Sequence, residues 1–153
     1  MKINIYSIEK TDEYINITNE YIKKISQFAK AEDINIFNKQ IAQAQKISEL
    51  EAKKSYTQAS MKYIETKQPA YNIALDVQGK DIDSFKFAKL LEDKAQVNFF
   101  IGGAYGWESS FLGKCDNIVS LSKLTMSHKI AKIVLYEQIF RGLSINHNHP
   151  YHK

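Results

Sequence analysis

The sequence predicts an α/β fold in which a parallel sheet is covered by helices on both faces. Strand-like and helix-like segments alternate five times with short connections, which is typical of such folds. Residues 96–101 form a continuous apolar run, as a central parallel strand does. The 153 residues, 44% hydrophobic and 25% charged, contain no repeat or low-complexity tract. We therefore expect one domain spanning 1–153.

The N-terminal segment is predicted to form a strand followed by a helix. Residues 2–8 alternate apolar and polar side chains. Thr11 is the expected N-cap of the helix, with Asp12 and Glu13 in its first turn and apolar positions at helical spacing as far as Phe28. This helix should cover one face of the sheet.

The next segment is predicted to contain a short strand and a long helix. The strand is expected at 34–37. Residues 39–67 are highly charged with sparse apolar positions, which indicates a mostly exposed helix. It should end before Pro69, because the residue preceding a proline disfavours helical geometry.

A third strand is expected at 71–77, closed by a turn at Gly79. Asp83 or Ser84 should then cap a helix that passes through Phe87, Leu90 and Leu91. The strand at 96–101 follows and ends in the sequence GGAYG, residues 102–106.

The C-terminal part should contain a short helix, a fifth strand and a long helix. We expect them at 108–114, 117–121 and 128–145. The last helix is apolar around most of its circumference, so it needs a second surface to contact. A symmetric dimer would supply that surface, and a central position in the core is the alternative.

Charge and composition constrain the partners. The net charge of +4 is mildly favourable for an anionic partner. No segment has the features of a secretory signal or a membrane span, and Cys115 is the only cysteine, so a cytoplasmic protein without membrane contact is expected. Arg141 is the only arginine among 21 basic residues. It suggests a site that needs a guanidinium, with chance or a buried ion pair as the alternatives.

The loops at the carboxyl ends of the strands are the expected ligand site, because ligands of parallel α/β folds collect there. These loops follow Val77, Ile101 and Leu121. The glycines of 102–106 would allow close approach of a ligand, although a structural turn is the alternative. The dinucleotide and phosphate-loop glycine patterns are both missing. Trp107 could stack on an aromatic ligand or serve only in packing.

The C-terminal sequence NHNHPYHK holds three of the four histidines. Its H-x-H-x-x-H spacing could ligate zinc or nickel, but no thiol or carboxylate lies nearby in sequence, so no metal is expected. A disordered end is another alternative. Pro150 stiffens the backbone and Tyr151 offers a large surface to bury, which favours docking of the tail.

Three segments together resemble a known family: ALDVQGK at 74–80, FFIGGAYG at 99–106, and SLSKLTMSH through YEQIFRGLSINHNHPYHK from 120 to the end. In this order and spacing the chain resembles the ribosomal large-subunit pseudouridine N3-methyltransferases, a single-domain branch of the SPOUT methyltransferases. The resemblance runs over the whole chain and is densest after residue 70.

The resemblance implies an α/β SPOUT-type fold with a deep C-terminal trefoil knot. It also implies S-adenosyl-L-methionine as cofactor, a homodimer paired through the last helices, and methylation of large-subunit ribosomal RNA on the assembled ribosome. The cofactor-binding positions carried over are Leu75, Gly102, Gly103, Gly106, Leu121, Ser122, Lys123, Leu124, Thr125 and Met126.

The resemblance places Arg141, Tyr151 and His152 at the active site, where the tail of one protomer would complete the pocket of the other. A uracil-type ring nitrogen carries a proton near neutral pH, and a base or a cation must help it leave. Arg141 would stabilise the resulting anion or hold a phosphate, while Tyr151 and His152 would orient the base or relay the proton. Glu137, one turn before Arg141, would hold the guanidinium.

The sequence departs from the family pattern at two positions near these motifs. Family members often have proline at 127 and arginine at 132, where this chain has Ser127 and Lys132. The first change implies a looser cofactor loop, and the second puts one phosphate contact in doubt. They motivate an alternative function, a non-catalytic module that binds RNA or a nucleotide. His128, at the mouth of the cofactor loop, is a further candidate or only a helix cap.

Overall fold

The computed structural model describes residues 1–153 and contains one five-stranded sheet in which every strand pair is parallel. The strand order is β2-β1-β4-β3-β5, so β4 is central as predicted. The strands are β1 (Lys2–Ile8), β2 (Lys30–Ile36), β3 (Tyr71–Asp81), β4 (Gln96–Ile101) and β5 (Asn117–Ser120). The helices are α1 (Ile15–Ile25), α2 (Lys39–Ile47), α3 (Glu49–Ile64), α4 (Ser84–Leu91), α5 (Ser109–Leu112) and α6 (His128–Asn146).

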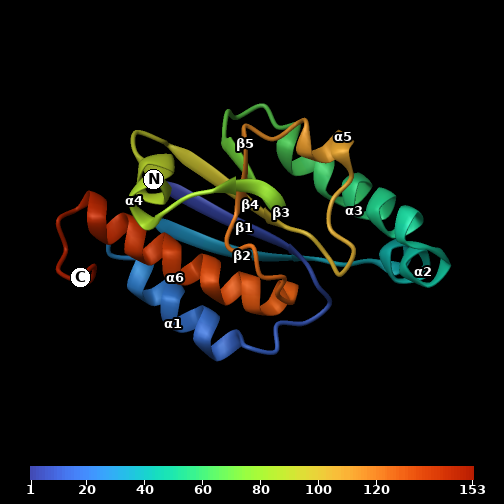
Figure 1. Cartoon of the computed structure of the whole chain (residues 1–153), viewed down its shortest axis with the longest axis horizontal. Helices are drawn as coiled ribbons and strands as arrows, with labels where there is room; N and C mark the ends of the chain where they lie inside the picture. Colours follow the sequence, from blue (N-terminus) through green and yellow to red (C-terminus); the bar gives the residue numbers. More distant parts are fainter.

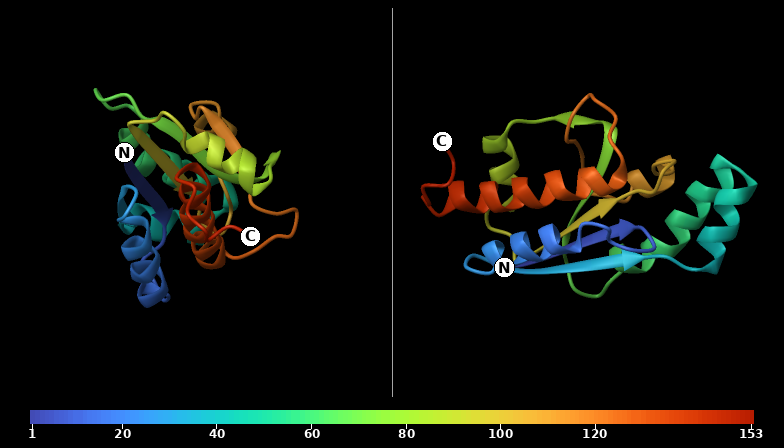
Figure 2. Two further views of the ribbon diagram at one scale, coloured as in Figure 1. Left: turned by 90° about the vertical axis from the view of Figure 1, so that its left-hand side faces the viewer. Right: turned by 90° about the horizontal axis from the view of Figure 1, so that it is seen from below.

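Each face of the sheet has its own hydrophobic cluster, because successive side chains of a strand point to opposite faces. Ile3 and Ile5 of β1 belong to a 17-residue cluster with α1, α4 and α6. Tyr6 and Ile8 belong to a 10-residue cluster with α2, α3 and α5. Figures 1 and 2 show these two helical layers on opposite sides of the sheet. The predicted fold class is confirmed.

A row of asparagines fixes the register of the three central strands. Asn4, Asn98 and Asn72 are paired directly across β1, β4 and β3. The Asn4 amide donates to Asn98, and the Asn98 amide donates to Asn72, each at 2.9 Å. All three are buried, so a register slip would leave polar groups without partners in the core.

The first helix begins later than predicted. Tyr14, not Thr11, is the N-cap of α1, and the helix ends at Ile25. The Asp12 carboxylate accepts hydrogen bonds from the Tyr14 N–H at 2.9 Å and from the Thr18 hydroxyl at 2.8 Å. It therefore orders the turn before the helix instead of lying in its first turn. As predicted, α1 packs on one face of the sheet.

The single long helix predicted for 39–67 is wrong. Ser48 separates α2 from α3, and its hydroxyl accepts a hydrogen bond from the Glu51 N–H at 3.1 Å as the N-cap of α3. Nor is this region mostly exposed, because Ala52 and Tyr56 are completely buried against the sheet. The preceding strand, β2, also begins four residues earlier than predicted, at Lys30.

The turn predicted at Gly79 does not end the third strand, because β3 runs on to Asp81. Its pairing with β5 shifts register, so that Val119 pairs with both Leu75 and Lys80. The later elements follow the prediction closely, with Asp83 as the N-cap of α4.

The last helix crosses the sheet between α1 and α4, which it contacts along its length (Figure 1). Leu135, Tyr136, Ile139 and Leu143 are buried in the core, whereas Ile130 is 41% exposed. The helix is therefore a core helix that still presents apolar surface to solvent. No helix is long and apolar enough to span a membrane.

Candidate functional site

A cavity of about 390 Å³ lies at the carboxyl ends of β3, β4 and β5. Residues 75–78 within β3 and the loops after β4 and β5 line it, together with the first turn of α6 and one residue of α3. Its volume falls within the range of small-molecule sites, roughly 300–1,000 Å³. The structure thus has a cavity at the edge of the sheet where the sequence predicts the ligand site.

Most of the predicted cofactor-binding residues meet at this cavity. The predicted residues that line it are Leu75, Gly102, Gly103, Gly106, Leu121, Ser122, Leu124, Thr125 and Met126. They come from three segments that are separated in the sequence and joined only by the parallel pairing of the strands.

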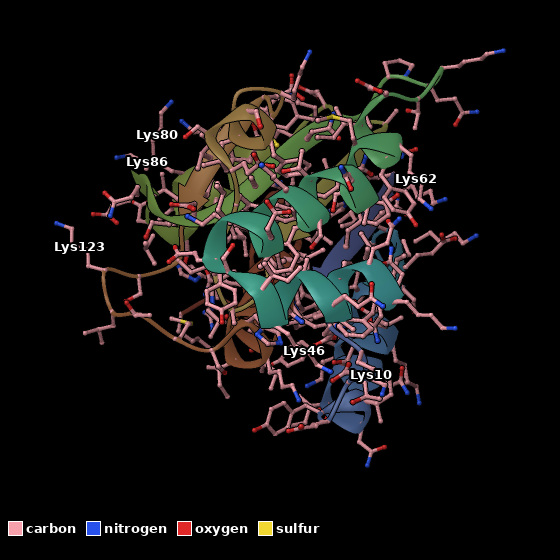
Figure 3. The ribbon with its side chains drawn as sticks, turned by 90° about the vertical axis from the view of Figure 1, so that its right-hand side faces the viewer. Lys10, Lys46, Lys62, Lys80, Lys86 and Lys123 are labelled. Carbon is pink, nitrogen blue, oxygen red and sulfur yellow. The ribbon has the colours of Figure 1, made fainter.

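Lys123 is the predicted cofactor-binding residue that the structure does not bring to the cavity. Its side chain is 86% exposed, and its Nζ lies 3.4 Å from Asp81. Figure 3 shows it pointing away from the body of the protein, on the same side as Lys80 and Lys86. Its side chain lies in solvent and not inside the cavity.

The glycines after β4 are required by close contacts and by backbone geometry. A Cβ on Gly103 would lie 2.6 Å from the ring of Tyr56, which packs beneath the loop from α3. Gly106 has a φ of +76°, which residues with a side chain rarely adopt. The backbone therefore forms the cavity wall here, with Tyr56 packed against Gly103 from behind and open space beside Gly106.

The loop after β5 is ordered by its own serines. The Ser122 hydroxyl accepts a hydrogen bond from the Leu124 N–H at 3.0 Å, and the Ser120 hydroxyl donates to the Ser122 carbonyl at 2.9 Å. Ser127 is the N-cap of α6, and its hydroxyl accepts from the Ile130 N–H at 3.3 Å. Serine at 127 thus caps the helix at the end of the loop, and the expectation of a looser loop than with proline stays a prediction.

Several residues that line the cavity were not predicted as ligand contacts. They include Lys53, Asp76, Gln78 and Tyr105. Asp76 directly follows the buried part of β3. A carboxylate next to the predicted ligand loop after Val77 was a usable signal of a ligand contact. Lys53 gave none, because α3 reaches the cavity only through tertiary packing.

Trp107 lies at the border of the cavity and serves mainly in packing. Its ring stacks on Phe111 at 4.1 Å between centroids and meets Phe100 edge-on at 6.5 Å. It is 4% exposed, and its indole N–H has no hydrogen-bond partner.

A polar cluster centred on Glu137 lies near the C-terminal end of α6. Glu137 Oε1 accepts hydrogen bonds from Arg141 Nη2 at 2.5 Å and from the Tyr151 hydroxyl at 3.0 Å. Arg141 Nη1 lies 3.2 Å from His152 Nδ1. Since a guanidinium has no acceptor, this nitrogen of His152 must accept, which leaves Nε2 to carry the proton. The structure therefore brings all four predicted catalytic residues together.

The tail is docked, not free. The Tyr151 ring packs on Phe140 at 4.6 Å and lies under the Arg141 guanidinium at 4.8 Å. His147 stacks on Phe28 at 4.7 Å, and His152 meets Phe85 edge-on at 4.9 Å. His149 also meets Phe28, edge-on at 5.7 Å, so all three tail histidines contact aromatic rings. No cluster of metal-ligating side chains occurs in the structure.

Hydrogen bonding and burial shift the titration of this cluster. The hydrogen bond to Glu137 raises the pKa of Arg141. Burial, with the hydrogen bond to Glu137 second, raises the pKa of Tyr151 to about 12. Tyr151 is therefore a protonated donor near neutral pH, which makes it unsuitable as a base.

The cavity and the Glu137 cluster lie at opposite ends of α6. The helix begins at the cavity with His128 and carries Arg141 thirteen residues later, roughly 20 Å along its axis at 1.5 Å per residue. Figure 1 shows the C-terminus at the far end of α6 from the loop that leads into it. Within one chain the tail does not reach the cavity.

Lys132 is buried in the protein and not exposed to a phosphate. It is 1% exposed, with its Nζ 2.5 Å from Glu9 and 2.8 Å from Asp33. Asp12 lies 3.4 Å away. Burial would lower the pKa of Lys132, but the hydrogen bonds to Asp33 and Glu9 outweigh it and raise that pKa. A lysine buried in this way does not contact a phosphate, which agrees with the doubt that the sequence placed on that contact.

His128 lines the cavity as the first residue of α6. It does not cap the helix, because Ser127 does so. Burial lowers the pKa of His128, and the nearby Lys129 and Lys132 ammonium groups act in the same direction against an opposing effect of Glu9. The imidazole is thus favoured in its neutral form beside the cavity.

Comparison with known proteins places this arrangement in a family. A sequence profile described as "Predicted SPOUT methyltransferase" matches residues 1–152. The chain is 56% identical over 156 residues to "Ribosomal RNA large subunit methyltransferase H" of Sulfurovum sp. (strain NBC37-1), with 100% of both chains covered. It is 54% identical to the protein of the same name from Aliarcobacter butzleri (strain RM4018), again with 100% of both chains covered.

A solved structure shares the fold. The crystal structure of a ribosomal RNA small subunit methyltransferase E from Neisseria gonorrhoeae, bound to S-adenosyl methionine, matches with a TM-score of 0.50 at 11% identity. The match covers 90% of this chain and 64% of that chain. The sequence profile and the full-length relatives lead to one conclusion: this chain belongs to the SPOUT methyltransferase family, alongside the proteins named ribosomal RNA large subunit methyltransferase H.

Proposed function

We propose that the protein transfers a methyl group from S-adenosyl-L-methionine to N3 of a pseudouridine in large-subunit ribosomal RNA. Full-length relatives at 50–56% identity carry the name of a large-subunit ribosomal RNA methyltransferase, which supports the RNA substrate. The observation that carries the proposal is the pair of sites on α6, a glycine-walled cavity at one end and an arginine cluster at the other. We further propose that the protein acts on ribosomes in the cytoplasm.

The residues at the cavity fit S-adenosyl-L-methionine. The space beside Gly106 is open, with only Asp76 Oδ2 near the position of a Cβ, and apolar Leu75, Leu121 and Met126 offer surface for an adenosine. The cofactor, when bound, supplies an activated methyl group on a sulfonium. Such a transfer needs no metal, and its rate depends on alignment of donor and acceptor.

The Glu137 cluster supplies the chemistry on the acceptor side. Loss of the N3 proton to water leaves an anion on the base, which the Arg141 guanidinium can stabilise. Glu137 holds that guanidinium through two of its nitrogens, Nε at 3.0 Å and Nη2 at 2.5 Å. Tyr151, protonated near neutral pH, can donate a hydrogen bond to the base. His152 is held by Arg141 through Nδ1, which leaves its other nitrogen for the substrate.

A homodimer would join the two half-sites. If the α6 helices of two protomers pair antiparallel, the tail of each meets the cavity of the other. Exposed apolar side chains lie at both ends of the helix: Leu124 and Ile130 near the cavity, 78% and 41% exposed, and Phe85 beside His152, 57% exposed. Burial of these residues in one interface explains why they are apolar.

The backbone around β5 is consistent with a trefoil knot in the C-terminal part. The chain from β3 pairs with β5 at two separate places, Leu75 and Lys80. The loop after β5 then returns to the cavity before α6 begins. We propose that this return passes through the loop formed by the earlier segment, as the family resemblance implies.

Mass spectrometry of ribosomal RNA tests the function. A strain lacking the gene should lose one methyl-pseudouridine from its large-subunit RNA, and the intact gene should restore it. A copy with Arg141→Ala should not restore it. An unchanged modification profile in the deletion strain would contradict the proposal. Assembled ribosomes, compared with free RNA as substrate for the purified protein, would show which form is accepted.

The alternative of a non-catalytic binding module loses its motive in the structure. Ser127 caps α6 and Lys132 is buried among carboxylates, so neither departure from the family pattern removes a cavity contact. Calorimetry with S-adenosylmethionine separates the two functions, since the module need not bind the cofactor.

A further inference from the structure

The charges that line the cavity are few and opposite in sign. Among its 20 lining residues, Lys53 is the only lysine or arginine and Asp76 is the only carboxylate. The remaining lining groups are apolar, glycine or neutral polar residues, apart from His128. A ligand that fits this pattern has an anionic group near Lys53 of α3 and a cationic group near Asp76 of β3.

α3 is held firmly against the glycine loop, so Lys53 has a fixed base. Tyr56, one helical turn after Lys53, is completely buried and packs beneath Gly103. The Tyr56 hydroxyl donates to Gln45 of α2 at 2.7 Å, which ties the two helices together. Lys53 therefore stands at the rim of the cavity on a rigid element.

The ammonium of Lys53 is available for a ligand. Its one ionic partner is Glu49, 3.3 Å away, whose side chain is 64% exposed. A pair of this kind contributes little and exchanges readily with water or another anion. The Lys53 side chain itself is 30% exposed, so it can turn toward the cavity without leaving a buried carboxylate unpaired.

Asp76 fixes the direction of the ligand. One of its carboxylate oxygens accepts a hydrogen bond from the Gln78 N–H at 2.9 Å. The other lies 4.0 Å from the position that a Cβ on Gly106 would take, and so faces the empty side of the glycine loop. A cationic group would be attracted here, whereas an anionic one would be repelled.

We propose that Lys53 binds the carboxylate of the amino-acid end of S-adenosyl-L-methionine, which would make it a specificity-determining residue for the cofactor. The proposal rests on the proposed function, because it assumes this ligand. It explains why a lysine of α3, far in sequence from the loops, lines the cavity.

The test compares two ligands that differ only in this carboxylate, S-adenosylmethionine and its decarboxylated form. Lys53→Met should weaken binding of the first about tenfold, as expected for loss of a hydrogen bond between charged groups, and leave binding of the second unchanged. Binding of the decarboxylated form also shows that the variant is folded. The matched control is Lys54→Met, since Lys54 pairs with Glu51 on the same helix outside the cavity and should alter neither affinity.

Equal effects of Lys53→Met on both ligands, or no effect on either, would overturn the proposal while the function stands. If the unaltered protein fails to bind either ligand in calorimetry, the proposed function itself fails, and the role of Lys53 with it.

Discussion

Gly103 illustrates how a single residue shapes the cavity. Only glycine fits at this position, because a Cβ would lie 2.6 Å from the Tyr56 ring. That ring cannot move easily, because it is completely buried and its hydroxyl is bonded to Gln45. The wall of the site therefore depends on a contact between two helices and a loop, and not on a ligand-binding side chain.

Gly103→Ala should displace the loop and weaken cofactor binding by about tenfold or more, with a loss of stability of about 1–3 kcal/mol from overpacking. Calorimetry and urea denaturation measure the two effects. Gly113→Ala is the control, because the nearest contact of its Cβ would be an ordinary 3.4 Å. Equal behaviour of the two variants would show that the contact with Tyr56 does not matter.

His128 makes the stability of the protein depend on pH. Its pKa is lowered in the folded state, so between that pKa and its unfolded value near 6.5 the unfolded chain binds more protons. The contribution of neutral His128 to the free energy of unfolding is complete above about pH 6.5 and is lost as the pH falls through its lowered folded-state pKa. Urea denaturation should show the free energy of unfolding falling more steeply below that pH for the natural protein than for His128→Gln. Curves that differ by a constant amount from pH 5.5 to 8 would contradict this assignment.

The sequence predicted the role of some site residues and not of others. The glycines after β4 and the loop 121–126 were predicted because each follows a recognisable strand and matches a family motif. Lys53 and Asp76 were missed as ligand contacts, and the burial of Lys132 among carboxylates was not predicted. Burial of a lysine is set by carboxylates from distant segments, and no local pattern reveals them.

At the scale of elements, α6 is joined to the sheet by charge as well as by apolar packing. Lys132 connects it to Glu9 after β1, to Asp33 of β2 and to Asp12 before α1. Tyr136, one turn later, donates to Asp33 at 3.0 Å. One cation thus compensates three carboxylates at the end of the sheet next to the cavity.

Lys132→Met should destabilise the protein by about 3–5 kcal/mol, because it leaves these carboxylates buried without a cation. The control, Lys129→Met, removes the neighbouring lysine that pairs with the exposed Glu13 and should cost no more than about 1 kcal/mol. Chemical denaturation compares the two. A similar small loss in both variants would mean that water compensates the carboxylates of the cluster.

Elements with strong local signals were predicted well. β1, β4, α4 and α6 agree with expectation to within one residue, because alternation, a continuous apolar run or a clear cap marks them. The break at Ser48 was missed, since serine is tolerated inside helices and only the N-cap geometry shows that it separates α2 from α3. The extension of β3 to Asp81 depends on pairing with β5, which comes 36 residues later and has no local trace.

At the scale of the whole molecule, the two parts of the site are kept apart by the length of α6. The cavity and the Glu137 cluster each have a complete set of local contacts, yet one chain cannot bring them together. Apolar residues are exposed at both ends of the helix, where the proposed second copy would cover them. Dimerisation would thus be part of catalysis and not only of stability.

Mixing two inactive variants tests this claim most directly. Arg141→Ala keeps the cavity and loses the guanidinium, whereas Gly103→Val displaces the loop that forms the cavity wall, through its clash with Tyr56, and keeps the tail. Neither homodimer should transfer methyl groups from labelled S-adenosylmethionine to ribosomes of a strain lacking the gene. After co-refolding in equal amounts, half of the dimers are mixed and each has one intact composite site, so about a quarter of the natural activity should return. Complete absence of activity in the mixture, with mixed dimers verified by mass spectrometry, would contradict a site shared between protomers.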